Sequence, residues 1–292
     1  MKINISAITD IGRQRENNED ACAYCPDIDH PSWPGKSMTG YKPLGSNGSF
    51  IVVADGMGGP NAGEVAAAIA IDCVKKTFSD TAVTSTAAKK DDDAKALMHQ
   101  TIVEADKAIN QRIIDDPDTA GMGTTIVLCW IMPGKAHVAW CGDSRCYLYN
   151  EDGGLQPLTK DHSYVQELVD RGDITAEEAF NHPDSNIITR GLGDFDAAVQ
   201  PDIITVKVSP GDTLLLCSDG LCGYNTDSQI EQVIKESDGS ATQSTDQLLR
   251  LALDAGGYDN ISIAVASVID DDVQSPGSPH GLWAMLKSLF RH

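Results

Sequence analysis

The sequence has little positive charge. Lysine and arginine together number 22 among 292 residues, against 43 aspartates and glutamates, so the formal net charge is −21 at pH 7. A chain this acidic repels nucleic acid and anionic membrane surfaces, which excludes non-specific binding to either. Its field attracts cations instead. Most of the carboxylates are nevertheless expected to form a solvated face.

Long apolar runs are also missing. No window approaches the roughly 18 apolar residues of a membrane span, and the first residues, MKINISAITDIG, lack the basic-then-apolar pattern of a secretory signal. Cys73, Cys129, Cys141 and Cys217 lie inside apolar runs, as small core residues with free thiols do in a reducing compartment. We therefore expect a cytoplasmic protein with no transmembrane segment.

A zinc-type cluster is absent as well. Cys22 and Cys25 form a single Cys-x-x-Cys pair, with no second pair and no histidine cluster at zinc-ligand spacing. The pair is therefore only a weak indication of a metal or redox site.

The hydrophobic residues, 41% of the chain, are enough for a substantial core and follow two periods. Apolar runs and alternation predict strands, and apolar residues three and four apart predict helices on which one face is buried. The strands are predicted at 3–8, 49–54, 124–132, 136–142, 145–149, 202–208, 213–218 and 261–269, and the main helices at 62–74, 97–113, 229–235 and 242–255. Closely spaced strands favour antiparallel pairing. We predict an α+β fold, a four-layer α-β-β-α sandwich of two mostly antiparallel sheets flanked by helix pairs.

One catalytic domain is expected to span residues 1–269. Within it, residues 27–48 are rich in proline, glycine and serine and predict an extended surface loop, residues 79–93 predict a polar connector, and 161–193 form an excursion with two short helical patterns. Residues 270–292 predict a linker and a short amphipathic C-terminal helix. Such a helix is too short to be stable alone, and docking on its own domain or fraying is favoured over anchoring to a membrane or partner.

Two apolar runs end on Asp-Gly. Asp55-Gly56 follows one predicted strand and Asp219-Gly220 follows another. A single Asp-Gly after a strand is most often a hairpin turn, because both residues tolerate positive φ. Here each pair leads towards a helix and not into a second hairpin arm, which weakens that interpretation.

Three further aspartates, Asp20, Asp143 and Asp259, stand at comparable strand ends. Five carboxylates gathered at one sheet edge would repel one another and some would protonate. Hard divalent cations remove that cost, and Mg²⁺ or Mn²⁺ suits oxygen ligands better than zinc does. Two such ions can lower the pKa of a shared water from about 15.7 towards neutrality. Arg15 is the nearest cation in sequence for a substrate phosphate, although a surface arginine is an equally good interpretation from local sequence.

The motifs together resemble the metal-dependent protein phosphatase 2C family of the bacterial type. The resemblance runs in order over nearly the whole chain to Ile269. It rests on TDIGRQRENNED, VVADGMGGPNAGEVAA, GMGTTIVL, VAWCGDSRCYLY, LTKDHSYVQELVDRGDIT, HPDSNIITRGLG, LLLCSDGL and DNISIAV. The family fold, a β-sandwich flanked by helix pairs, agrees with the layers predicted above.

The resemblance implies a dinuclear metal centre. It places Asp55 between two Mn²⁺ or Mg²⁺ ions, with the carbonyl of Gly56 as a ligand of one of them. Asp219 and Asp259 match the other carboxylate ligands, and Asp20 matches a ligand that acts largely through bound water.

Other roles also follow from the resemblance. Asp143 matches the ligand of a third, weaker metal, Glu19 would orient metal-bound waters, and Arg15 would hold the substrate phosphate. Asn260 would support the neighbouring ligand from behind, and residues 161–193 correspond to a flap that borders the active site.

The implied activity is that of a serine/threonine protein phosphatase in which a metal-bridged hydroxide attacks phosphorus without a phosphoenzyme. Its partners would be phosphoserine and phosphothreonine proteins and an opposing serine/threonine kinase. Some relatives carry a histidine where this chain has Met57, and methionine cannot donate a proton, so water would protonate the leaving group. The alternatives are a catalytically silent regulator, disfavoured because every metal aspartate is present, and a two-metal nucleic-acid enzyme, disfavoured by the charge of −21.

Overall fold

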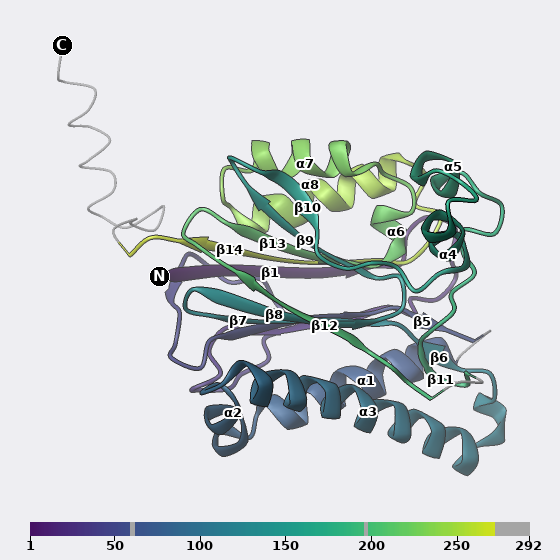
Figure 1. Cartoon of the computed structure of the whole chain (residues 1–292), viewed down its shortest axis with the longest axis horizontal. Helices are drawn as coiled ribbons and strands as arrows, with labels where there is room; N and C mark the ends of the chain where they lie inside the picture. Colours follow the sequence, from purple (N-terminus) through teal and green to yellow (C-terminus); the bar gives the residue numbers. More distant parts are fainter. Residues whose placement is uncertain (59–61, 196–197, 272–292) are drawn as a thin grey trace.

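Two large β-sheets lie face to face, and helices cover the outer face of each. The computed structural model describes residues 1–58, 62–195 and 198–271, and Figure 1 shows the four layers edge-on. The predicted α-β-β-α sandwich is therefore confirmed.

The first sheet has six strands, all paired antiparallel. In spatial order they are β10 (Gly154–Pro157), β9 (Arg145–Asn150), β13 (Thr213–Cys217), β14 (Ile261–Ile269), β1 (Lys2–Asp10) and β3 (Lys42–Pro43). The central pair, β1 and β14, stays in register from Lys2 opposite Ile269 to Asp10 opposite Ile261. The first described strand thus lies beside the last one.

The second sheet has five strands, also antiparallel. Their order is β12 (Asp202–Lys207), β8 (Lys135–Cys141), β7 (Ile126–Met132), β4 (Ser49–Ala54) and β2 (Ala21–Cys25). A small third sheet orders β11 (Leu192–Gly193), β6 (Gly123–Thr124) and β5 (Gly56–Met57). Strands β4 and β7 are buried along their whole length because one face meets the other sheet and the other face meets helices.

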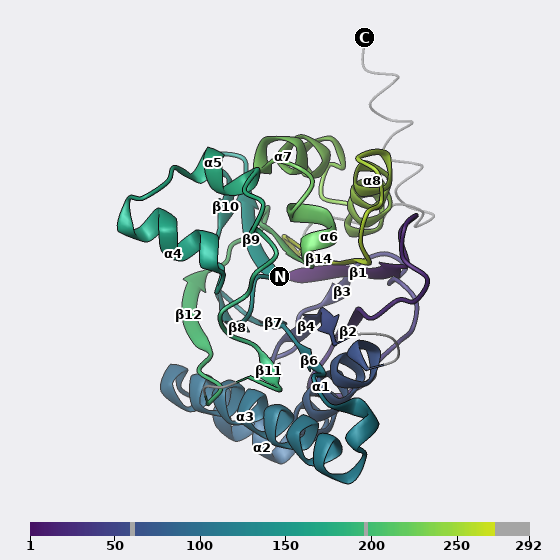
Figure 2. The same cartoon turned by 90° about the vertical axis from the view of Figure 1, so that its right-hand side faces the viewer.

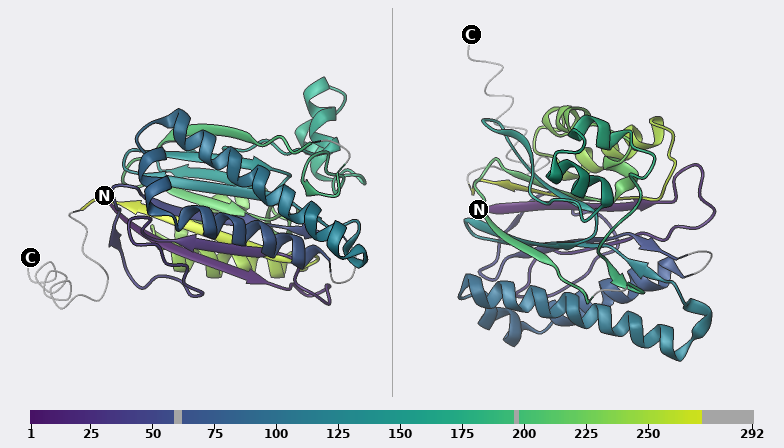
Figure 3. Two further views of the ribbon diagram at one scale, coloured as in Figure 1. Left: turned by 90° about the horizontal axis from the view of Figure 1, so that it is seen from below. Right: turned by 45° about the vertical axis from the view of Figure 1, so that its right-hand side comes forward.

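The helices form one layer on each side. Helices α1 (Gly63–Phe78) and α3 (Asp91–Asp115) lie across the second sheet, with α2 (Thr81–Ala87) beside them, as Figure 3 shows from below. Helices α7 (Asp227–Glu236) and α8 (Ala241–Asp254) cover the first sheet. One apolar cluster fills the space between the sheets, with Ile3, Ile5, Val53, Leu214 and Ala264 among its members. The sandwich is therefore a rigid frame for the loops at its ends.

The polar connector predicted for residues 79–93 is wrong, because helices occupy most of it. Asp80 caps α2, and its carboxylate accepts hydrogen bonds from the backbone N–H groups of Ala82 and Val83 at 3.0 and 3.1 Å. Thr84 and Ala87 are buried. Short elements outside the prediction include the strands β2, β3, β5, β10 and β11, the 3₁₀ turn η1 (Pro117–Thr119) and α6 (Asp219–Cys222).

The extended segment 27–48 is fastened along the edge of the first sheet. The Met38 N–H donates to the carbonyl of Ile5 at 3.0 Å, and the Leu44 N–H donates to that of Met1 at 3.1 Å. The Asn4 side chain donates to the carbonyl of Gly40 at 2.7 Å. This segment covers an edge strand whose backbone would otherwise be open to pairing with another chain.

Residues 161–193 leave the sandwich and return to it. They carry α4 (Tyr164–Arg171) and α5 (Ala176–Phe180), close to both helical predictions, and Figure 2 shows these helices standing beside the sheets. We call this segment the flap. The linker and C-terminal helix predicted for 270–292 lie almost wholly outside the described residues, which end at Asp271. Across the described part of the chain, no helix combines the length and the apolarity that crossing a membrane requires.

Candidate metal centre

The predicted carboxylates meet in one cleft at the end of the sandwich where β5 and α6 lie (Figure 1). Asp55 follows β4, Asp143 lies between β8 and β9, Asp219 begins α6, and Asp259 stands two residues before β14. All four line a cleft with a volume of about 400 Å³. The fold therefore brings together aspartates from four separate parts of the chain, as the sequence predicts.

Asp20 is not one of the residues that line this cleft, although its charge interacts with those of Asp219 and Asp259. Its side chain is buried, and the Ser218 hydroxyl donates to its Oδ2 at 2.7 Å. The same hydroxyl accepts from the Ser262 N–H at 2.9 Å, which links the ends of β13 and β14. Asp20 is thus held near the other carboxylates by a polar contact of its own.

The buried carboxylates have raised pKa values. Burial, the largest cause, together with the charge of Asp219 raises the pKa of Asp20 to about 7. Burial and the charge of Asp259 raise the pKa of Asp219 to about 6, and the pKa values of Asp55 and Asp143 also lie well above the usual range because of burial and neighbouring carboxylates. One or more cations in the cleft would relieve this repulsion.

The donor set fits Mg²⁺ or Mn²⁺. It consists of carboxylate oxygens and the backbone at Gly56, and among the described residues no histidine or thiol lines the cleft. Within residues 1–58, 62–195 and 198–271, no group of three or more histidine, cysteine or carboxylate side chains is placed closely enough to hold a metal ion. An open arrangement agrees with these ions, because Mg²⁺ keeps several waters and takes only one or two carboxylates in many protein sites.

Arg15 lies at the mouth of the cleft and pairs with Asp259. Its Nη2 donates to Asp259 Oδ2 at 2.6 Å, and the side chain is 53% exposed. This hydrogen bond is the largest cause of its raised pKa. A guanidinium anchored beside the carboxylates and open to solvent can reach an incoming phosphate.

The turn after β4 is fixed by its neighbours. The Asp55 N–H donates to Thr125 Oγ1 at 3.1 Å, while the Thr125 N–H and the Thr124 hydroxyl both donate to the Asp55 carbonyl at 2.8 Å. A Cβ on Gly56 would lie 2.2 Å from the carbonyl oxygen of Gly63. Only glycine fits at this point, because the backbone of Gly56 packs directly against that of Gly63 in the wall of the cleft.

Glu19 and Asn260 connect opposite ends of the chain at the cleft. The Asn260 side-chain oxygen accepts from the Glu19 N–H at 2.8 Å, and its amide donates to the carbonyls of Ile11 and Asn17 at 3.0 and 2.9 Å. Both residues line the cleft. Asn260 therefore holds the segment that carries Arg15 and Glu19 against the start of β14.

Several cleft residues were not predicted as catalytic, binding or metal-ligating residues. Thr125, Asn186 and Ile188 line the cleft, as do Met57 and Gly58. Thr125 lies in a motif noted in the sequence, but its contact with Asp55 depends on β4 and β7 being neighbours. Asn186 and Ile188 come from the flap, and their place depends on how the flap folds back. The sequence predicts that this segment borders the active site, but it does not indicate which flap residues reach the cleft.

Comparison with known proteins gives consistent matches. A sequence profile described as protein phosphatase 2C matches residues 42–254. Protein phosphatase PhpP of Streptococcus pneumoniae is 35% identical over 272 residues, which are 93% of this chain and all of that protein. The crystal structure of serine/threonine phosphatase Stp1 from Staphylococcus aureus has a TM-score of 0.77 at 32% identity and covers 91% of this chain and 95% of its own. The catalytic domain of the serine/threonine protein phosphatase PstP, in complex with two manganese ions, has a TM-score of 0.73 at 32% identity, covering 92% and 99%.

Proposed function

Because the chain belongs to the protein phosphatase 2C family, we propose that it is a metal-dependent serine/threonine protein phosphatase. The observation that carries the proposal is the cleft in which Asp55, Asp143, Asp219 and Asp259 meet beside Arg15. The relatives named as serine/threonine phosphatases support it. We assign the catalytic domain to residues 1–269. Its substrates would be phosphoserine and phosphothreonine proteins, placed opposite a serine/threonine kinase.

We assign the metal ligands to the cleft carboxylates. Asp55, Asp219, Asp259 and the Gly56 carbonyl would hold two Mn²⁺ or Mg²⁺ ions, and Asp20 would be a further ligand that acts largely through bound water. The manganese ions of the PstP structure support this assignment. When bound, the ions supply a water of lowered pKa as the nucleophile and neutralise charge on the phosphoryl oxygens. Asp143, set apart between β8 and β9, would hold a third and weaker ion.

The protein's own groups provide orientation. Arg15, held beside Asp259 at the mouth of the cleft, would bind two phosphate oxygens through its planar guanidinium. Asn260 keeps the backbone of Glu19 in place, so that the Glu19 carboxylate can orient water at the rim of the cleft. These fixed groups would lower the barrier mainly by positioning the phosphate and by electrostatic stabilisation of the transferring group.

The first experiment is phosphate release from a phosphothreonine peptide. The protein should release phosphate with Mn²⁺, lose that activity with EDTA and regain it on adding Mn²⁺ back. Asp219→Asn should lower kcat/KM at least 100-fold, about 2.7 kcal/mol of barrier, because it removes a ligand charge. Asp152→Asn, an exposed change in the turn after β9, is the control and should match wild type. A loss of less than threefold in Asp219→Asn would contradict the assigned role.

A further inference from the structure

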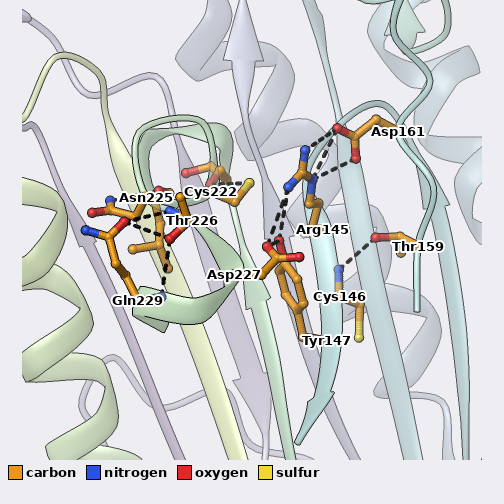
Figure 4. Close-up of polar contacts among 12 residues, drawn as sticks. Arg145, Cys146, Tyr147, Thr159, Asp161, Cys222, Asn225, Thr226, Asp227 and Gln229 are labelled. Carbon is orange, nitrogen blue, oxygen red and sulfur yellow. Dashed lines mark hydrogen bonds and ion pairs between the residues drawn. The ribbon is translucent and has the colours of Figure 1, made fainter. Parts of the chain in front are cut away.

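A partly buried ion pair attaches the start of the flap to the first sheet. Arg145, the first residue of β9, donates from Nε to Asp161 Oδ1 at 2.9 Å and from Nη2 to Asp161 Oδ2 at 2.7 Å, as Figure 4 shows. The Asp161 side chain is 14% exposed and that of Arg145 is 28% exposed. A two-point contact of this kind fixes both the distance and the orientation of the carboxylate.

The other side of the guanidinium is fixed as well. Arg145 Nη1 donates to the Tyr147 hydroxyl at 3.1 Å, and that hydroxyl donates to Asp227 Oδ1 at 3.0 Å (Figure 4). Asp227 is the first residue of α7. In the sheet, Arg145 pairs with Cys217 at the end of β13. Arg145 is thus held by the sheet and by α7, and the flap is attached to this fixed point.

Backbone pairing within the flap connects the residues after Asp161 to the flap residues that line the cleft. Ser163 forms a bridge with Ile188, and the Tyr164 N–H donates to the Ile187 carbonyl at 2.8 Å. The Thr189 N–H donates to the His162 carbonyl at 2.7 Å. The outgoing residues that follow Asp161 therefore pair with the returning residues 187–189.

The returning residues form one wall of the cleft. Asn186 and Ile188 line it together with the aspartates that belong to the sandwich. A second contact supports the same point, because the His162 N–H donates to the Gly142 carbonyl at 3.0 Å and the Gly142 N–H donates to His162 Nδ1 at 3.2 Å. The start of the flap is thus bound to Gly142, just before Asp143 in the sequence, and to Arg145, just after it.

We propose that Arg145 is a positioning residue for phosphoprotein hydrolysis. Through Asp161 it fixes the outgoing strand of the flap, and through that strand it sets the place of Asn186 and Ile188 at the cleft. The inference rests on the proposed function. A phosphopeptide long enough to touch the flap wall depends on this geometry, whereas a small aryl phosphate held by the metals and Arg15 does not.

The test compares two substrates in the full-length protein with Mn²⁺. Arg145→Met should raise KM for a phosphothreonine peptide at least fivefold, while kcat/KM for p-nitrophenyl phosphate changes less than twofold. Arg145→Lys, which keeps the charge but can make only single-point contacts, should give an intermediate KM. Asp161→Asn should reproduce the Arg145→Met effect, and the double variant should add little to either single change, because both remove one interaction.

Arg171→Met is the matched control. Arg171 lies in the same flap and pairs with Asp173 at 3.0 Å, but both side chains are more than half exposed, so the variant should match wild type on both substrates. An unchanged peptide KM in Arg145→Met would overturn the proposal. So would an equal loss on both substrates together with a higher Mn²⁺ requirement, because Arg145 would then support the metal centre itself.

Two further outcomes remain decisive. If Arg145→Met does not fold, Asp161→Asn carries the test, since it keeps the shape of the side chain, and a normal peptide KM in that variant overturns the proposal. If wild type hydrolyses neither substrate, the proposed function fails. Hydrogen exchange then tests the contact by itself: Asp161→Asn should speed exchange at the amides of Tyr164 and Thr189, and unchanged exchange would show that Arg145 does not hold the flap.

Discussion

Gly56 is surrounded by backbone atoms that cannot move away. A Cβ at this position would lie 2.2 Å from the carbonyl oxygen of Gly63 and 2.5 Å from that of Glu19. Gly56→Ala should therefore displace the turn that carries Asp55, lowering activity at least tenfold and stability by about 1–3 kcal/mol. Phosphopeptide hydrolysis and urea unfolding measure the two effects.

Gly35→Ala is the control for this substitution. A Cβ at Gly35 would meet nothing within 4 Å, so the variant should keep wild-type activity and stability. If Gly56→Ala and Gly35→Ala have the same activity and stability, the backbone around Gly56 can move to accommodate a Cβ, and the prediction is wrong.

His137 makes the fold sensitive to acid. Its side chain is fully buried in β8, where Nδ1 contacts Thr205 Oγ1 at 2.8 Å, and burial lowers its pKa to about 4. The unfolded chain, with a histidine pKa near 6.5, therefore binds a proton that the folded protein does not bind between these values. Stability present above about pH 6.5 is lost as the pH falls towards 4.

The prediction for His137 is a difference between variants. On going from pH 7 to pH 5, wild type should lose on the order of 1–2 kcal/mol more unfolding free energy than His137→Asn, as measured by urea unfolding. His99→Asn, at an exposed position of α3, should lose as much as wild type. If His137→Asn loses as much as wild type, other groups control the acid sensitivity.

Individual cleft residues could be predicted where an aspartate stands directly at the end or the start of an apolar run. Asp55 and Asp219 each follow a buried strand, and Asp259 precedes one. Asn186 and Ile188 gave no such signal, because a flap residue reaches the cleft only through the pairing of 163 with 188. The ion pair of Arg15 with Asp259 joins residues 244 positions apart and was equally invisible in the sequence.

At the scale of single elements, one capping motif occurs on two helices with different surroundings. Thr226 and Gln229 form a capping box at the start of α7, and Thr175 and Glu178 form one at the start of α5. Helix α7 buries Ile230 and Ile234, whereas none of the five residues of α5 is buried. The same motif therefore stabilises part of the core in one helix and a surface excursion in the other.

The matched pair Thr226→Ala and Thr175→Ala should separate the two effects. Thr226→Ala should lower the global unfolding free energy by about 1 kcal/mol. Thr175→Ala should leave it within about 0.3 kcal/mol of wild type but speed hydrogen exchange within residues 175–180, because only local opening is affected. Equal global losses would show that the flap unfolds together with the sandwich.

The longer strands were predicted because each contains a continuous apolar run, as β7 and β14 do. Segment 79–93 was misassigned because serine, threonine and aspartate dominate its composition. In the structure, however, Asp80 acts as a cap, and Thr84 packs inside with its hydroxyl donating to the Asp80 carbonyl at 3.0 Å. Sequence composition does not distinguish a capping aspartate from a loop aspartate.

At the scale of the whole molecule, divalent metal should stabilise the fold. The formal charge of −21 and the buried carboxylates of the cleft both destabilise the folded state by repulsion. A metal ion bound in the cleft would relieve the repulsion among the cleft carboxylates in particular. Mn²⁺ at one hundred times its dissociation constant should add about 2.7 kcal/mol, raising the melting temperature by several degrees in a thermal scan. EDTA should reverse the rise, and Asp259→Asn should reduce it.

Sodium chloride at matched ionic strength is the control for that scan. It screens the general repulsion without binding in the cleft. An equal rise with sodium chloride would mean that overall charge, and not the carboxylate cleft, limits stability.

The layers of the sandwich were predictable, but the order of strands within each sheet was not. Periodicity shows which face of a strand is buried but not which strand lies beside it. The placement of β1 between β14 and β3 depends on contacts between residues far apart in the sequence. The predicted convergence of five carboxylates likewise required the assumption that the strand ends share one edge of the sandwich.

The pairing of β1 with β14 has a consequence for synthesis on the ribosome. Asp55, Asp143 and Asp219 leave the exit tunnel well before Asp259, and the strand beginning at Ile261 must emerge before β1 gains its central neighbour. A nascent chain therefore carries an exposed edge on its first described strand, and an incomplete set of cleft carboxylates, until residue 269 has left the tunnel. Catalytic competence would then arise at one late moment, when the last described strand closes the sheet around the first.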